Sequence, residues 1–71
     1  MDIEPGEIRF GVIAVRKGYV KPTHIVNAIQ AQIDEDLTTG SHRRIGEILL
    51  QENLLDQTQL EEVLKIQRSE S

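Results

Sequence analysis

The amino-acid sequence predicts an all-α fold, in which two tandem helical hairpins pack as a small four-helix domain with an internal pseudo-two-fold repeat. Two observations lead to this prediction. Leu60, Val63 and Leu64 follow the i, i+3, i+4 spacing of an amphipathic helix. In addition, residues 44–67 align with residues 9–32 when the chain is shifted by 35 positions (44 minus 9). The chain is therefore an internal duplication.

The two copies share identical residues as well as an apolar pattern. The identical pairs are Arg9 and Arg44, Gly11 and Gly46, Ile13 and Ile48, Thr23 and Thr58, and Gln32 and Gln67. Gly18 aligns with Asn53, and these are the residue types best suited to a left-handed helix end. We interpret residues 1–71 as a single domain, with repeat 1 over 9–32, a connector over 33–43 and repeat 2 over 44–67.

A first helix is expected from about Pro5 to Lys17, after a loose end at residues 1–4. Proline suits the first helical position and Glu7 suits the first turn. Residues 12–15 (VIAV) taken alone favour a strand, because β-branched residues dominate them. The aligned residues EILL of the second copy favour a helix, and duplicated sequences share a fold, so we expect a helix here.

Pro22 is placed to begin a second helix, which is expected to end near Asp36. Residues 37–41 (LTTGS) form the clearest connector in the sequence. Ser41 is suited to cap a third helix that runs to about Glu52.

The second hairpin turn has a clear sequence signature. Asn53 is expected to adopt the left-handed conformation that ends a helix. Asp56 and Gln59 have the spacing of a capping box, which predicts a fourth helix over 57–68. The last three residues, 69–71, are expected to fray.

Gly11 and Gly46 occupy the same position inside the first helix of each repeat, where glycine costs about 1 kcal/mol relative to alanine. Two explanations are open for this pair. The more common one is close contact between helices, and the other is close approach of a ligand to the backbone.

Composition excludes several classes of function. The 71 residues carry a net charge of −4, no cysteine, and only Phe10 and Tyr19 as aromatic residues. This balance argues against nucleic-acid binding, and no apolar run is long enough for membrane insertion. His24 and His42 lack a second ligand at metal spacing. We therefore expect a cytoplasmic, non-catalytic domain without a metal site, and not an enzyme.

The repeated pattern resembles the N-terminal domain of type II secretion and type IV pilus assembly ATPases, in which one branch binds cyclic di-GMP through two tandem copies. The second copy matches with Arg44, Gly46, Leu49, Leu50, Leu54, Leu55, Leu60, Leu64 and Gln67. The first copy matches with Arg9, Gly11, Val15, Gly18, Tyr19, Val20, Ile25, Ile29 and Gln32. The chain departs from the pattern at Phe10, Ala14, Ile45 and Asn53, and its spacer over 33–43 is several residues longer.

The resemblance implies a candidate ligand site and a class of partner. Arginines 9 and 44 would contact guanine or phosphate, and glutamines 32 and 67 the guanine edges. The candidate ligand-binding residues are Arg9, Gly11, Gln32, Arg44, Gly46 and Gln67. The alternative is that these arginines and glutamines are solvated surface residues. No Walker-type glycine–lysine loop is present, so the ATPase activity is not implied.

We therefore expect a non-catalytic regulatory or adaptor domain that binds a partner protein, because the related domains contact other components of the secretion or pilus machine. A cyclic di-GMP receptor module is the alternative. A structural unit that forms a homo-oligomer is the third interpretation.

Overall fold

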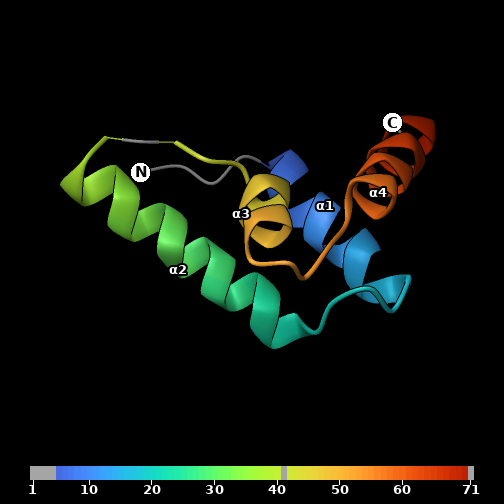
Figure 1. Cartoon of the computed structure of the whole chain (residues 1–71). Helices are drawn as coiled ribbons and strands as arrows, with labels where there is room; N and C mark the ends of the chain where they lie inside the picture. The colour runs from blue at the N-terminus through green and yellow to red at the C-terminus, as the bar shows by residue number, and fades with distance from the viewer. Residues whose placement is uncertain (1–4, 41, 71) are drawn as a thin grey trace.

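The computed structural model describes residues 5–40 and 42–70. The elements in chain order are α1 (Pro5–Arg16), α2 (Pro22–Thr38), α3 (Ile45–Gln51) and α4 (Gln57–Glu70) (Figure 1). The described residues contain no strand, and Val12–Val15 lie inside α1. The all-helical prediction is therefore confirmed, including residues 12–15, whose β-branched side chains taken alone favour a strand.

Two helices extend further than predicted. The second helix, α2, continues to Thr38, where the Thr38 hydroxyl donates to the Asp34 carbonyl at 2.7 Å. At the other end of the chain, α4 continues to Glu70, and the Ser69 hydroxyl donates to the Lys65 carbonyl at 3.1 Å. Residues 69 and 70 are therefore helical and not frayed, because the Arg9 guanidinium donates to the Glu70 carboxylate at 2.8 Å and holds the last turn of α4 against α1. Residues 1–4 and 71 lie outside the described residues.

The third helix begins later than predicted. Residues 42–44 are not helical, and α3 has only seven residues. The amide of Ile45 donates to a carboxylate oxygen of Glu7 at 3.1 Å, and the amide of Arg44 donates to Glu47 at 3.1 Å. These carboxylates satisfy the first amides of α3, so the helix begins at Ile45. The predicted cap Ser41 lies outside the described residues.

The two hairpin turns are in register with the duplication. The first turn has Gly18 at φ +77°, and the second has Asn53 at φ +62°. The amide of the next residue bonds back to Ala14 (3.1 Å) in the first turn and to Leu49 (2.9 Å) in the second. Both turns are therefore Schellman motifs, and the predicted left-handed conformation of Asn53 is confirmed.

The predicted capping box at α4 is also present. The Asp56 side chain accepts from the Gln59 amide at 2.7 Å, and the Gln59 side chain accepts from the Asp56 amide at 3.0 Å. In repeat 1 the equivalent positions are Lys21 and His24, and only the second half of the box forms, with His24 Nδ1 accepting from the Lys21 amide at 3.0 Å.

In the tertiary structure each helix of one repeat packs mainly against a helix of the other repeat. The first helix, α1, packs most extensively on α4, and α2 packs on α3, while α1 and α3 meet at the centre. Figure 1 shows α2 and α4 on opposite sides of α3. Exchanging α1 with α3 and α2 with α4 reproduces the same contacts, which is the predicted pseudo-two-fold arrangement. The core lies along α1 and α3, where Phe10, Ile13, Ala14, Ile45, Ile48 and Leu49 are buried.

The repeated glycines lie where two helices approach closely. A Cβ atom on Gly11 would lie 2.9 Å from Ile25 Cγ2, and one on Gly46 would lie 2.7 Å from Leu60 Cδ1. Ile25 and Leu60 are themselves equivalent positions of the two repeats. Because each glycine lacks a Cβ atom, the second helix of its own hairpin can pack closely against it. The structure therefore supports close helix packing as the reason why both repeats have a glycine at this position.

Candidate functional site

Each repeat has a groove beside its glycine. The first-repeat groove, of about 360 Å³, lies between α1 and α2 and is lined by Ile8, Gly11, Val12, Val15, Arg16, Pro22, Ile25 and Ile29. The second-repeat groove, of about 180 Å³, involves α3, α4 and the start of α1. It is lined by Gly6, Glu7, Phe10, Arg44, Gly46, Glu47, Leu60, Leu64 and Gln67. The two grooves are therefore related by the duplication.

The grooves have the same construction but different chemistry. They share four equivalent positions, which are Gly11 and Gly46, Val12 and Glu47, Ile25 and Leu60, and Ile29 and Leu64. The first-repeat groove is aliphatic apart from Arg16 at one end. The second-repeat groove carries a glutamine and three charged side chains. The equivalent surfaces of the two repeats are therefore almost wholly aliphatic in one case and a mixture of apolar and charged residues in the other.

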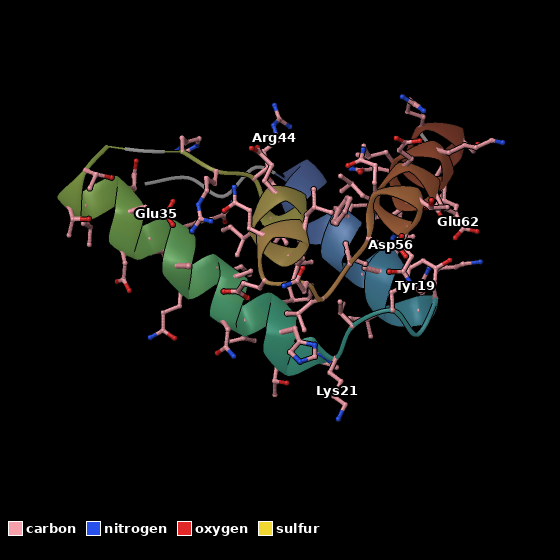
Figure 2. All side chains as sticks on the ribbon, viewed as in Figure 1. Tyr19, Lys21, Glu35, Arg44, Asp56 and Glu62 are labelled. Carbon is pink, nitrogen blue, oxygen red and sulfur yellow. The ribbon has the colours of Figure 1, made fainter. Side chains whose placement is uncertain are left out.

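In repeat 2 the structure brings the three predicted ligand residues together. Arg44, Gly46 and Gln67 all line the second-repeat groove, and Arg44 lies at the start of α3 (Figure 2). The Gln67 side-chain amide donates to the Gly6 carbonyl at 2.9 Å. One of its hydrogen-bonding groups is therefore engaged with the chain itself.

In repeat 1 the corresponding residues do not all line the first-repeat groove. Gly11 lines the first-repeat groove, but Arg9 and Gln32 are not among its lining residues. The Arg9 guanidinium donates to Glu70 at 2.8 Å, and the Gln32 amide donates to the Arg43 carbonyl at 3.0 Å. Arg9 thus joins α1 to α4, and Gln32 joins α2 to the segment that enters α3.

The second-repeat groove is negatively charged. Glu7 and Glu47 line it together with Arg44, so its formal charge is negative by one unit. Both carboxylates lie at the start of α3, where they accept the amides of Ile45 and Arg44 at 3.1 Å. A helix N-terminus attracts anions, but here the protein's own carboxylates already occupy that position. An anionic ligand would have to compete with them.

The exposed aliphatic residues of repeat 1 were not among the predicted site residues. Ile8 and Val12 line the first-repeat groove and are 43% and 37% exposed. The equivalent residues 35 positions later are Arg43, directly before repeat 2, and Glu47 within it. Comparison of the two copies position by position would have identified them, because a polar residue in one copy shows that the fold does not need an apolar residue in the other.

A cluster of polar contacts around Arg43 holds the connector between the repeats against α2 and α3. The Arg43 guanidinium donates to both carboxylate oxygens of Glu35, at 3.0 Å from Nε, and also to the side chain of Gln51. Glu35 lies on α2 (Figure 2). Gln51 is the last residue of α3. The hydrogen bond to Arg43 lowers the pKa of the Glu35 carboxyl and raises the pKa of the Arg43 guanidinium.

The remaining polar residues form no metal cluster within residues 5–40 and 42–70, where no three His, Asp or Glu side chains gather. His42 Nδ1 lies 3.6 Å from an oxygen of Asp36. None of the four helices, as far as the structure describes them, has the length and apolar character needed to cross a membrane.

Comparison with protein-family models, with curated proteins and with solved structures finds no match for this chain.

Proposed function

We propose that this chain is a non-catalytic adaptor domain that binds a partner protein through the first-repeat groove. The observation that carries the proposal is the difference between the two repeats. The chain has Arg43 directly before repeat 2 and Glu47 within it, whereas the equivalent positions at repeat 1 carry the exposed residues Ile8 and Val12. Exposed apolar side chains that are not needed for folding, and that gather beside a groove, are typical of protein-binding surfaces.

The dimensions of the groove favour a helical segment of the partner. On α1 its aliphatic wall runs from Ile8 to Val15, and on α2 it runs from Pro22 to Ile29. Seven residue steps of 1.5 Å give a length of about 10 Å, which is two turns of a helix. An amphipathic helix with aliphatic residues at i, i+3 or i+4, and i+7 would fill a groove of this length.

The resemblance to the N-terminal domains of secretion and pilus ATPases supports the same class of function, since those domains contact other components of their machines. On this proposal the domain acts in the cytoplasm and contributes no catalytic group.

A photo-crosslinking amino acid at position 12 tests the proposal directly. Val12 lines the groove, and Lys65 on α4 offers an exposed control position. We expect an adduct with one partner protein from position 12 and none from position 65. The partner identified by mass spectrometry is then purified and titrated.

The decisive variant in that titration is Val12→Glu, because it installs the residue that repeat 2 carries at the same place. We expect the fold to be unchanged and the affinity to fall at least tenfold, since a charge would have to be buried in an apolar contact. Equal affinity of the two proteins would exclude the groove as the binding site.

A second candidate function is a cyclic di-GMP receptor, favoured by the meeting of Arg44, Gly46 and Gln67 in one groove. On this proposal Arg44→Ala would weaken binding by about 1.5–3 kcal/mol, the range of a charge-assisted hydrogen bond. Glu47→Gln would strengthen it, because a carboxylate beside the bound phosphates is removed. Isothermal titration measures both effects. The absence of heat with the unaltered chain at millimolar cyclic di-GMP would end this candidate.

A further inference from the structure

The outer face of α2 carries an aliphatic stripe that the four-helix fold leaves partly exposed. We call it the outer stripe, and it consists of Pro22, Val26, Ile29, Ile33 and Leu37. Val26 and Leu37 are 61% and 74% exposed, the highest values among the large hydrophobic side chains of the described residues. The opposite side of α2 faces α3 and holds the buried Ala28. Figure 1 shows α2 at the edge of the molecule.

The duplication supplies an internal comparison for this stripe. At the equivalent positions α4 carries Gln57, Glu61, Leu64 and Arg68. The same kind of helix, in the same place relative to its repeat, therefore folds with a mostly polar outer face. Ile29 packs against the core, but folding does not account for Val26 and Leu37, which are exposed and lie outside the core cluster.

The charges around the outer stripe are arranged with opposite signs at its two ends. Arg16 and Lys21 lie at the end where α2 begins, and neither has an acidic partner among the described residues. Asp34 and Asp36 lie near the other end, on either side of the stripe as judged by 100° of rotation per residue. The segment that best complements this pattern is α2 itself, turned end for end.

We propose that α2 pairs antiparallel with α2 of a second copy of this chain, through the outer stripe. In this register Pro22 faces Leu37 of the other copy, Val26 faces Ile33, and Ile29 lies next to the two-fold axis. Each basic end then meets the acidic end of its partner. Such an interface is isologous, so a two-fold axis closes it as a dimer without further growth.

The size of the surface makes this dimer weak. The stripe extends over 15 residue steps, or about 22 Å. A stable interface usually buries about 800 Å² and 20–30 residues of each partner. The accessible surface of the whole chain is 4751 Å², so a stable interface would need a large part of it. One helix face with its flanking charges falls below that requirement, so we expect a dissociation constant on the order of 100 µM. Because Pro22 and Ile29 also line the first-repeat groove, self-association and partner binding exclude each other.

Sedimentation velocity of the whole chain between about 10 µM and 1 mM tests the proposal without any partner protein. The mass is expected to rise from 8.1 kDa towards twice that value as the concentration increases. Val26→Glu installs the residue of the equivalent position in α4, and this variant is expected to stay monomeric. Leu64→Glu makes the same kind of change on α4, and it is expected to dimerise like the unaltered chain. Circular dichroism checks that both variants keep their helices.

The register is tested by charge reversal. Lys21→Glu is expected to weaken the dimer several-fold, and Asp36→Lys in the same chain is expected to restore it, because the two positions meet across the two-fold axis. A constant mass of 8.1 kDa up to 1 mM would overturn the dimer. If Val26→Glu and Leu64→Glu weakened dimerisation equally, the assignment of the interface to α2 would be overturned. If Asp36→Lys did not restore dimerisation of the Lys21→Glu chain, the antiparallel register would be overturned.

Discussion

Asn53 shows how a single residue ends a helix in this protein. Its φ of +62° lies in the left-handed region, and Gly18 has φ +77° at the same place in repeat 1. In both turns this conformation lets the next amide reach back to the last turn of the helix. Asparagine tolerates the left-handed region better than other residues with a side chain, but glycine tolerates it without strain.

Substitutions at Asn53 should therefore separate backbone strain from side-chain contacts. We expect Asn53→Gly to be neutral or to stabilise by up to about 1 kcal/mol. Asn53→Val should destabilise by about 1–3 kcal/mol, since a β-branched residue resists positive φ. Urea unfolding midpoints measure both variants, and equal midpoints would show that the turn does not depend on this conformation.

Gly11 is a second residue whose identity is determined by a close approach. Alanine would favour the helix by about 1 kcal/mol, but its Cβ would lie 2.9 Å from Ile25 Cγ2. That methyl group is attached directly to the Ile25 Cβ, so it cannot move away without a change of rotamer. Overpacking of this kind costs about 1–3 kcal/mol, which outweighs the gain in helix propensity.

A double-mutant cycle isolates this contact. Gly11→Ala alone is expected to lower the free energy of unfolding by about 1 kcal/mol. In an Ile25→Ala background the same substitution is expected to raise it by up to about 1 kcal/mol, because only the helix propensity remains. Thermal or urea unfolding supplies the values, and an unchanged effect in the second background would mean that Ile25 is not the cause.

At the scale of elements, α3 depends most on its surroundings. A seven-residue helix is too short to be stable alone in water. Its amide of Ile45 is capped by Glu7 from α1, and the segment before it is held by the ion pair of Arg43 with Glu35 of α2. Three of its residues, Ile45, Ile48 and Leu49, are fully buried. Neighbouring elements thus determine both where α3 begins and why it is stable.

The Glu35–Arg43 pair predicts a specific pH dependence. Its hydrogen bond lowers the pKa of Glu35 in the folded protein from the ordinary value of 4.5. The contribution to stability is therefore fully present above pH 4.5 and is lost as the pH falls through the lower folded-state pKa. We expect the Glu35→Gln variant to unfold at a lower urea concentration than the unaltered chain at pH 7. The difference between the two urea midpoints is expected to shrink as the pH falls from 5 to 3.

Arg43→Gln is the matched control, because it removes the partner and leaves the carboxylate. In that background Glu35→Gln should no longer change the pH dependence. A difference that persisted without Arg43 would assign the effect to another contact of Glu35.

At the scale of the whole molecule, contacts between the repeats dominate over contacts within them. Gln32 donates to the Arg43 carbonyl and Gln67 to the Gly6 carbonyl, so each repeat holds the segment that leads into the other. Tyr19, in the first turn, donates a hydrogen bond to Glu62 on α4 (Figure 2). The packing of α1 on α4 and of α2 on α3 has the same cross-repeat character.

This arrangement predicts that neither repeat folds alone. Peptides of residues 1–40 and 41–71 should each show little helix by circular dichroism, since isolated short helices are marginal. An equimolar mixture should recover helical signal, because it restores both cross-repeat pairings. Cooperative thermal unfolding of either peptide by itself would contradict the prediction.

The candidate site was only partly predictable from sequence. Arg44, Gly46 and Gln67 were expected to act together, and they do share a groove. Their counterparts Arg9 and Gln32 form contacts between elements instead. The presence of the Glu7 carboxylate in the second-repeat groove could not be predicted, because Glu7 is distant in sequence from the helix that it caps.

The sequence by itself determined the local structure of this protein. Helical periodicity, the left-handed residue at Asn53 and the capping box at Asp56 are all properties of a few neighbouring residues, and each is present in the structure. The duplication is visible in the sequence because it repeats the same local pattern 35 residues later. The tertiary structure decided the start of α3, the pairing of helices between repeats, and which faces stay exposed. These depend on contacts such as that of Arg9 with Glu70, between residues far apart in the chain, and local patterns carry no information about which distant segments meet.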